Sequence, residues 1–141
     1  MAIYSISQRT TGTTSGDAAH DVRTTSTDRA AILEAGVFMA AATASTYGVG
    51  RAGSAGTAST SNTVQAEDPA SPTGTVVCAT AWSAQPGDPS LYFRRWAGPA
   101  TIGTGVIWTF PRGLLVAVSA VMVLQNLASN GVVDSYWVVD E

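Results

Sequence analysis

Lysine is absent from this sequence, and charged residues make up only 12% of it. Soluble domains carry about 25% charged residues on average, so the surface is expected to be unusually neutral. All seven basic residues are arginines scattered along the chain, and the formal net charge is -3. Nucleic-acid binding requires Lys or Arg concentrated on one face. The composition therefore predicts no nucleic-acid partner, and it predicts a surface largely covered by partner proteins.

Cysteine and histidine occur once each, as Cys78 and His20. A single cysteine forms no intrachain disulfide, and acids in separate turns add no clustered metal-ligand spacing. Glu67 and Asp68 could join a calcium loop but lack the alternating acid pattern of a dedicated one. The sequence has no G-x-S-x-G nucleophile motif, and His20 and Asp21 would point to opposite faces of a strand. We therefore expect neither an enzyme nor a metal or cofactor site.

Long hydrophobic runs are also missing. The most apolar stretch, residues 114–124 (LLVAVSAVMVL), is too short for a membrane span of about 20 residues. The first ten residues, MAIYSISQRT, lack the positive and apolar regions of a secretory signal. We expect no membrane partner, and a protein that is made and kept in a cytoplasm.

The sequence does contain a glycine-rich stretch, YGVGRAGSAGT at residues 47–57. Gly48, Gly50 and Gly53 have the G-x-G-x-x-G spacing of a dinucleotide-binding turn, which requires a helix directly after it. Residues 54–63 (SAGTASTSNT) offer no large apolar residue for the buried face of such a helix. We interpret the stretch as a flexible loop between strands that binds no nucleotide.

Short apolar segments alternate with Pro, Gly and Asn-Gly punctuation along the rest of the chain. Roughly ten such segments at spacings near ten residues, without a convincing amphipathic helix, are typical of an all-β sandwich or barrel. Residues 30–44 mix helix-favouring and strand-favouring residues, and Gly36 favours a strand. The expected strands lie near residues 3–6, 20–25, 30–44, 63–66, 75–82, 91–96, 106–110, 114–118, 121–126 and 135–139.

Residues 1–18 are expected to form an extended N-terminal arm, with the sandwich domain over residues 19–141. The segment TTGTTSG at residues 10–16 is too polar to bury, so ordering it would cost backbone entropy with little hydrophobic return. Ile3, Tyr4 and Ile6 could anchor the arm as an added strand on a neighbouring subunit.

Two further segments are candidates for partner contacts. In Phe93–Trp96 (FRRW), Arg94 and Arg95 face opposite ways on a strand, so one can reach a partner carboxylate beside Trp96. A salt bridge within the same subunit is the alternative. The last strand is apolar on both faces, which places it centrally in its sheet or against a neighbouring subunit, with Tyr136 and Trp137 as contacts.

Nearly the whole chain resembles the small, lysine-poor, β-rich proteins encoded among virion genes of tailed bacteriophages and prophages. The resemblance is closest to decoration (cement) proteins with a jelly-roll sandwich. It rests on the order of five segments, DRAAILEAGVFMAAATASTYGVGR, EDPASP, LYFRRW, PATIGTGVIWTFPRGLLV and NLASNGVVDSYWVVDE. It implies a non-enzymatic homotrimer, assembled in the host cytoplasm, that sits on the capsid exterior and clamps neighbouring major capsid protein subunits.

A carbohydrate- or receptor-binding β-sandwich of a phage tail or head fibre is the alternative. Such a module needs coplanar, solvent-facing aromatic rings that stack on sugars, and Trp82, Tyr92 and Trp96 are the candidates. The decoration hypothesis instead expects these rings in the core or at subunit contacts.

Overall fold

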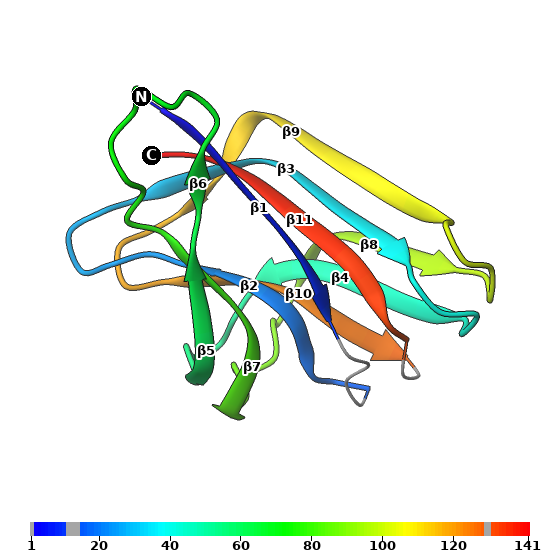
Figure 1. Cartoon of the computed structure of the whole chain (residues 1–141). Coiled ribbons are helices and arrows are strands. Elements are labelled where there is room, and N and C mark those ends of the chain that lie inside the picture. Colours follow the sequence, from blue (N-terminus) through cyan, green and yellow to red (C-terminus); the bar gives the residue numbers. More distant parts are fainter. Residues whose placement is uncertain (1, 11–14, 129–130) are drawn as a thin grey trace.

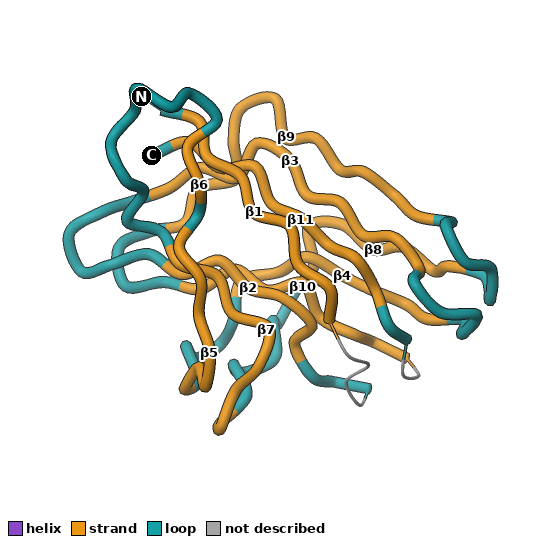
Figure 2. The backbone as a smooth tube through the Cα atoms, in the orientation of Figure 1, coloured by secondary structure: helices purple, strands orange, loops and turns teal. Residues whose placement is uncertain are grey.

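The structure is a computed structural model that describes residues 2–10, 15–128 and 131–141, and every regular element in these residues is a β-strand (Figures 1 and 2). Within them there is no helix long and apolar enough to span a membrane. The strands are β1 (Ile3–Thr10), β2 (Ala18–Arg23), β3 (Ala30–Met39), β4 (Ser45–Arg51), β5 (Thr57–Thr63), β6 (Gln65–Ala66), β7 (Val77–Ala84), β8 (Tyr92–Gly98), β9 (Gly105–Val116), β10 (Val121–Ala128) and β11 (Val133–Asp140).

Two antiparallel sheets pack face to face. The five-stranded sheet has the order β6-β1-β11-β3-β9, and the six-stranded sheet has the order β5-β7-β2-β10-β4-β8. Eight strands pair as a nested set, β1 with β11, β2 with β10, β3 with β9 and β4 with β8. This is the pairing of a jelly roll, a long hairpin rolled into two sheets. The expected all-β, jelly-roll-like sandwich is therefore confirmed.

Strands β5 to β7 are an insertion between β4 and β8 that closes one side of the sandwich. β5 pairs with β7 at the edge of the six-stranded sheet, and the chain then crosses through the buried Val64 to β6, which pairs with β1 in the other sheet. A strand that changes sheets makes a corner. We call the side of the sandwich that β5 to β7 cover the closed side.

The core lies between the sheets, and β11 shows the alternation that builds it most clearly. Along β11, Val133, Ser135, Trp137 and Val139 are buried while the residues between them are half-buried. β11 lies between β1 and β3, so its two-sided apolar character comes from a central position. The other large core residues are Tyr4, Ile32, Val37, Met39, Tyr47, Val49, Trp108, Phe110, Met122 and Leu124.

Two expected features are corrected in this part of the fold. Residues 106–110 and 114–118 were expected as separate strands, whereas Gly105–Val116 is one strand, β9. Its pairing with β3 passes from Thr109 opposite Glu34 to Leu114 opposite Ile32. The additional residues are accommodated at a bulge where Gly113 has φ 68°, a conformation that suits glycine. The PRG segment therefore bulges the strand instead of ending it.

The N-terminal arm is corrected for residues 3–10. They form β1, which pairs along its whole length with β11 of the same chain and also with β6. Tyr4 is buried in the core, and its hydroxyl donates to the carbonyl of Pro72 at 3.2 Å. Pairing with β11 and β6 satisfies the backbone hydrogen-bonding groups of β1. The inward side chains of β1 supply the apolar burial that the polar segment at residues 10–16 lacks. Residues 11–14 of the expected arm lie outside the described residues.

Candidate interface at the open side of the sandwich

The glycine motif makes room for a covering loop. Gly48 and Gly50 lie in β4, so the expected loop is wrong there, and a Cβ on them would lie 2.7 Å from Tyr92 and 2.6 Å from Pro89. Gly53 donates to the carbonyl of Gly87 at 3.0 Å. The next regular element is β5 rather than a helix. The glycines therefore let the β7–β8 connection cross the outer face of the six-stranded sheet, and the strand–turn–helix context of a phosphate cradle is missing.

His20 and Asp21 point to opposite faces of β2, as neighbours on a strand do. His20 lies in the core, where its Nδ1 is 2.9 Å from the Ser135 hydroxyl and its ring packs 5.9 Å from that of Trp137. Burial lowers the pKa of His20 to about 3. Its imidazole is therefore neutral at physiological pH and shielded from substrate.

Asp21 is equally buried on the other face and accepts hydrogen bonds from Arg23, the Ala79 N–H and the Trp82 indole at 2.8, 2.8 and 3.0 Å. Burial raises the pKa of Asp21, and Arg23 opposes that shift. β2 and β7 share one register pair, Arg23 with Val77. Beyond that pair, the Asp21 carboxylate holds the two strands together. Its role is structural.

The described residues contain no group of three or more His, Cys, Asp or Glu that could hold a metal ion. Cys78 is fully buried in the core, and burial raises its pKa well above the ordinary value. A neutral, enclosed thiol has little nucleophilic character. A surface is thus the remaining place to look for a site in the described part of the chain.

The aromatic residues proposed as a sugar platform are all half-buried. Trp82 donates to Asp21, and Trp96 packs against the core and over Gly98. Tyr92 lies over Gly48, and its hydroxyl donates to Gln125 at 3.4 Å. None of the three is free to lie flat against a sugar ring.

Five of the other predicted contact residues lie on the five-stranded sheet. Tyr4 and Trp137 are in the core, which removes them from the surface, and Ile6 packs against the core. Ile3 is 44% exposed.

Tyr136 lies on the outer face of the same sheet. Its hydroxyl donates to Glu34 at 2.5 Å, and its ring stacks on Phe38 with the centroids 6.4 Å apart. Figure 1 shows no strand over this face. The outer face keeps half-buried aromatic rings beside the exposed Ile107, which is opposite Gly36 in the register.

The side of the sandwich opposite the insertion is open. β8 and β9 are the edge strands of the two sheets there (Figure 1). Arginines contact both strands across the gap. The guanidinium of Arg51, at the end of β4, lies 4.8 Å from the centre of the Phe93 ring and donates to the Leu115 carbonyl at 3.0 Å. That of Arg94 lies 5.6 Å from the Phe110 ring centre. We call this region the open side.

A groove of about 380 Å³ runs along the open side, lined by Arg94, Phe110, Pro111, Arg112, Gly113 and Leu114. Arg51, Arg94 and Arg112 are exposed, and the ion pairs of the described residues use only Arg9 and Arg23. Arg95 lies on the other face of β8, 5.7 Å from the Tyr92 ring centre. The alternating directions expected of Arg94 and Arg95 are confirmed, and the alternative of an intrachain salt bridge is found for neither.

Sequence reasoning named the FRRW segment but missed Arg51, Arg112 and Leu115 as members of this surface. The surface combines three strands, β4, β8 and β9, that are far apart in the sequence. The pairing of β4 with β8 and the position of β9 at the neighbouring edge bring them together. Only the run of two arginines in FRRW gave a local signal.

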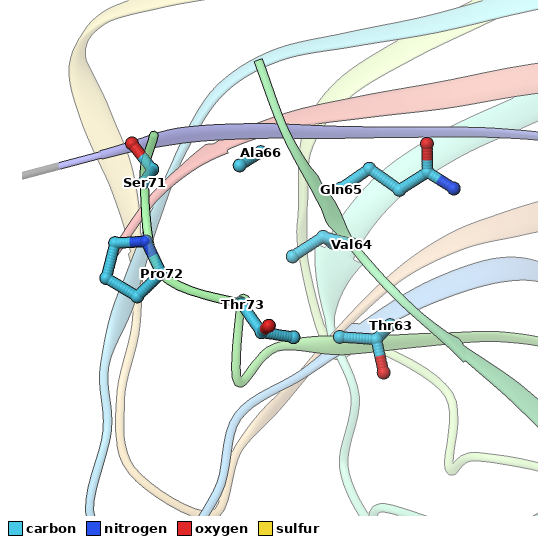
Figure 3. A pocket seen from close by; sticks show the side chains of 8 residues that line it. Thr63, Val64, Gln65, Ala66, Ser71, Pro72 and Thr73 are labelled. Atoms are coloured by element: carbon cyan, nitrogen blue, oxygen red, sulfur yellow. The ribbon is translucent and has the colours of Figure 1, made fainter. Parts of the chain in front are cut away.

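The closed side has a hollow of a different kind. Figure 3 shows it between β6 and residues 71–74. Its volume is about 410 Å³, and half of its eight lining residues are polar. The exposed Glu67 and Asp68 follow β6 directly, and the exposed Arg29 lies beside Pro72 and Thr73.

Comparison with known proteins gives no relative for this chain: no protein-family model matches it, and neither the curated proteins nor the solved structures contain a match.

Proposed function

We propose that this protein is a structural virion protein that decorates a bacteriophage capsid as a homotrimer and stabilises it by binding between major capsid protein subunits. Its place is the capsid exterior, reached after assembly in the host cytoplasm. The jelly-roll pairing supports this role, because the segments that carry the resemblance to decoration proteins form that sandwich. The low charge of the chain also supports it, since such a surface offers little electrostatic resistance to close packing.

One observation carries the proposal: large apolar side chains are exposed on the open side and on the outer face beside it. Leu91 is 82% exposed, Ile107 51% and Leu115 49%. An isolated soluble domain gains nothing from exposing such residues, whereas a subunit in a protein lattice buries them against its neighbours. Repeated attachment then converts weak single contacts into stable occupancy.

The two surfaces allow a division of roles. The outer face of the five-stranded sheet presents Tyr136, Phe38 and Ile107, beside the paired charges Arg9 and Asp134 at 2.7 Å and the Glu34 carboxylate that accepts from Tyr136. Such aromatic and aliphatic side chains suit a contact with a capsid surface. The open side carries unpaired arginines and suits a partner with carboxylates.

Co-sedimentation with capsids tests the proposal. Purified protein is mixed with capsids assembled from the major capsid protein of the same virion gene cluster, and the pelleted fraction is measured. The variant Ile107→Asp, on the outer face, should bind at least tenfold more weakly, while Val118→Asp, an equally apolar exposed residue in the β9–β10 turn, should bind as the wild type does. A wild-type protein that stays in the supernatant at saturating concentration contradicts the proposed function.

A further inference from the structure

Most of the arginines without an ion pair lie on the side opposite an acidic loop. β6 and β9 are the opposite edges of the five-stranded sheet, and β5 and β8 are those of the six-stranded sheet. The open side carries Arg51, Arg94 and Arg112 without a salt-bridge partner in the described residues. The closed side carries Glu67 and Asp68, both exposed, and a single exposed arginine, Arg29, which lines a pocket with Pro72 and Thr73. The open side is therefore basic, and the acidic loop lies on the other side of the sandwich.

The acidic loop is held in place. The Glu67 N–H donates to the carbonyl of Ile3 at 2.9 Å, and the Asp68 carboxylate accepts from the Ala70 N–H at 2.9 Å. The Ser71 N–H also donates to the Asp68 carbonyl at 3.0 Å, and prolines stand at positions 69 and 72. A loop fixed in this way loses little conformational entropy when it binds. Ile3, 44% exposed, adds an apolar contact beside the carboxylates.

The open side offers the complement of each feature. Arg94 and Arg112 line the groove with guanidinium groups, which bind carboxylates through two parallel hydrogen bonds. Leu114, also in the lining, provides apolar area next to them. Apolar residues, arginines and a groove occur together on this side, as they do where protein interfaces concentrate their binding energy.

We propose that the open side binds a second copy of this chain, with residues 67–72 of that copy docked in the groove and Glu67 and Asp68 paired with Arg94 and Arg112. The contact rests on the homotrimer of the proposed function and names its interface. Different surfaces of the two copies meet, so the contact is heterologous, and repetition around a rotation axis closes it into a ring. The outer face of the five-stranded sheet remains available for the capsid.

A competing explanation gives these residues the opposite role. Charged residues and prolines on edge strands often keep sheets from pairing edge to edge, and β8 and β9 contain Arg94, Pro111 and Arg112. If the arginines repel copies, neutralising them increases association. If they bind the acidic loop, reversing their charge dissociates the oligomer. The two explanations therefore predict changes of opposite sign.

Charge reversal tests the contact in solution, without capsids. Native mass spectrometry and sedimentation velocity at micromolar concentration compare the wild type with Arg112→Glu, with Glu67→Arg and with the chain that carries both substitutions. We expect the wild type to be oligomeric, each single variant to associate at least tenfold more weakly, and the double variant to recover association. Arg95→Glu, the same charge change on the other face of β8, is the matched control and should leave association unchanged. High salt should weaken the wild-type contact.

Circular dichroism verifies that each variant is folded, and Arg112→Gln with Glu67→Gln replaces any variant that is not. A monomeric wild type, single variants that associate normally, or larger assemblies on neutralisation would each overturn the contact. Capsid co-sedimentation of the monomeric variants separates this proposal from the proposed function. If the wild type is an oligomer that fails to bind capsids, the function is wrong and the contact stands. If the wild type is a monomer that binds capsids, the proposed contact is wrong and the capsid-binding function stands.

Discussion

Acidification should destabilise this protein through its one histidine. His20 is fully buried, and burial lowers its pKa from the ordinary 6.5 to about 3. Between these two values the unfolded chain binds a proton that the folded protein cannot, so stability falls as the pH drops below 6.5. The loss approaches about 1.4 kcal/mol per pH unit. From pH 7 to pH 5 it amounts to about 2 kcal/mol, a large part of the stability of a domain this size.

The assay is urea unfolding at pH 7, 6 and 5, at one protein concentration, for the wild type and for His20→Gln. Gln keeps most of the volume and can hydrogen-bond Ser135, which lies 2.9 Å from the His20 ring nitrogen, but it does not titrate. We expect the variant to be less stable at pH 7 and to lose about 2 kcal/mol less than the wild type on acidification. The shifts of the other acids are common to both proteins and cancel. Parallel pH profiles of the two proteins would refute the reasoning.

Two more substitutions and one deletion test the fold. Gly50→Val should destabilise the protein by about 1 to 3 kcal/mol in thermal unfolding, because its Cβ would lie 2.6 Å from Pro89. The control Ala81→Val, on the exposed part of β7, should have little effect. Equal effects of the two substitutions would contradict the loop that crosses β4 at Gly50. Asp21→Ala should lower the free energy of unfolding in urea by about 3 to 5 kcal/mol, because it leaves Arg23, the Ala79 N–H and the Trp82 indole without their acceptor. The control Asp134→Ala removes only an exposed ion pair and should cost much less. Deleting residues 2–10 should abolish cooperative unfolding followed by circular dichroism, since it removes Tyr4 from the core and the whole partner of one β11 edge; a folded truncated protein would restore the arm hypothesis.

Much of the fold was predictable, because turn residues and alternation are local signals. Pro and Gly punctuation marked most of the loops, and the apolar segment at residues 106–110 indicated part of β9. The pairing of β1 with β11 was not predictable in this way, because it joins residues more than 120 positions apart. Residues 3–10 have too little apolar area to form a stable strand on their own. The hydrogen-bonded partner that orders them is β11, at the other end of the chain.

The candidate site was predictable only in part, for the same reason. The FRRW segment indicated Arg94, but Arg51 and Arg112 join Arg94 only through the sheet order. The G-x-G-x-x-G spacing indicates that some other group packs closely against the backbone, but it does not identify that group. Here Tyr92 and Pro89 of the same chain take that place. Tyr4 and Trp137 were chosen as large aromatics in terminal strands, and those are the residues that a central strand buries.

Electron cryomicroscopy of the capsid from the same virion gene cluster, decorated with this protein, tests the central claim most directly. The account predicts three jelly-roll subunits per site on the capsid exterior, between major capsid protein subunits. The outer face with Tyr136 and Ile107 should be turned toward the shell, and the open side of each subunit, with Arg94 and Arg112, toward its neighbour. Density for this protein only at a tail or head-completion position, or none on the capsid at saturating concentration, would contradict it.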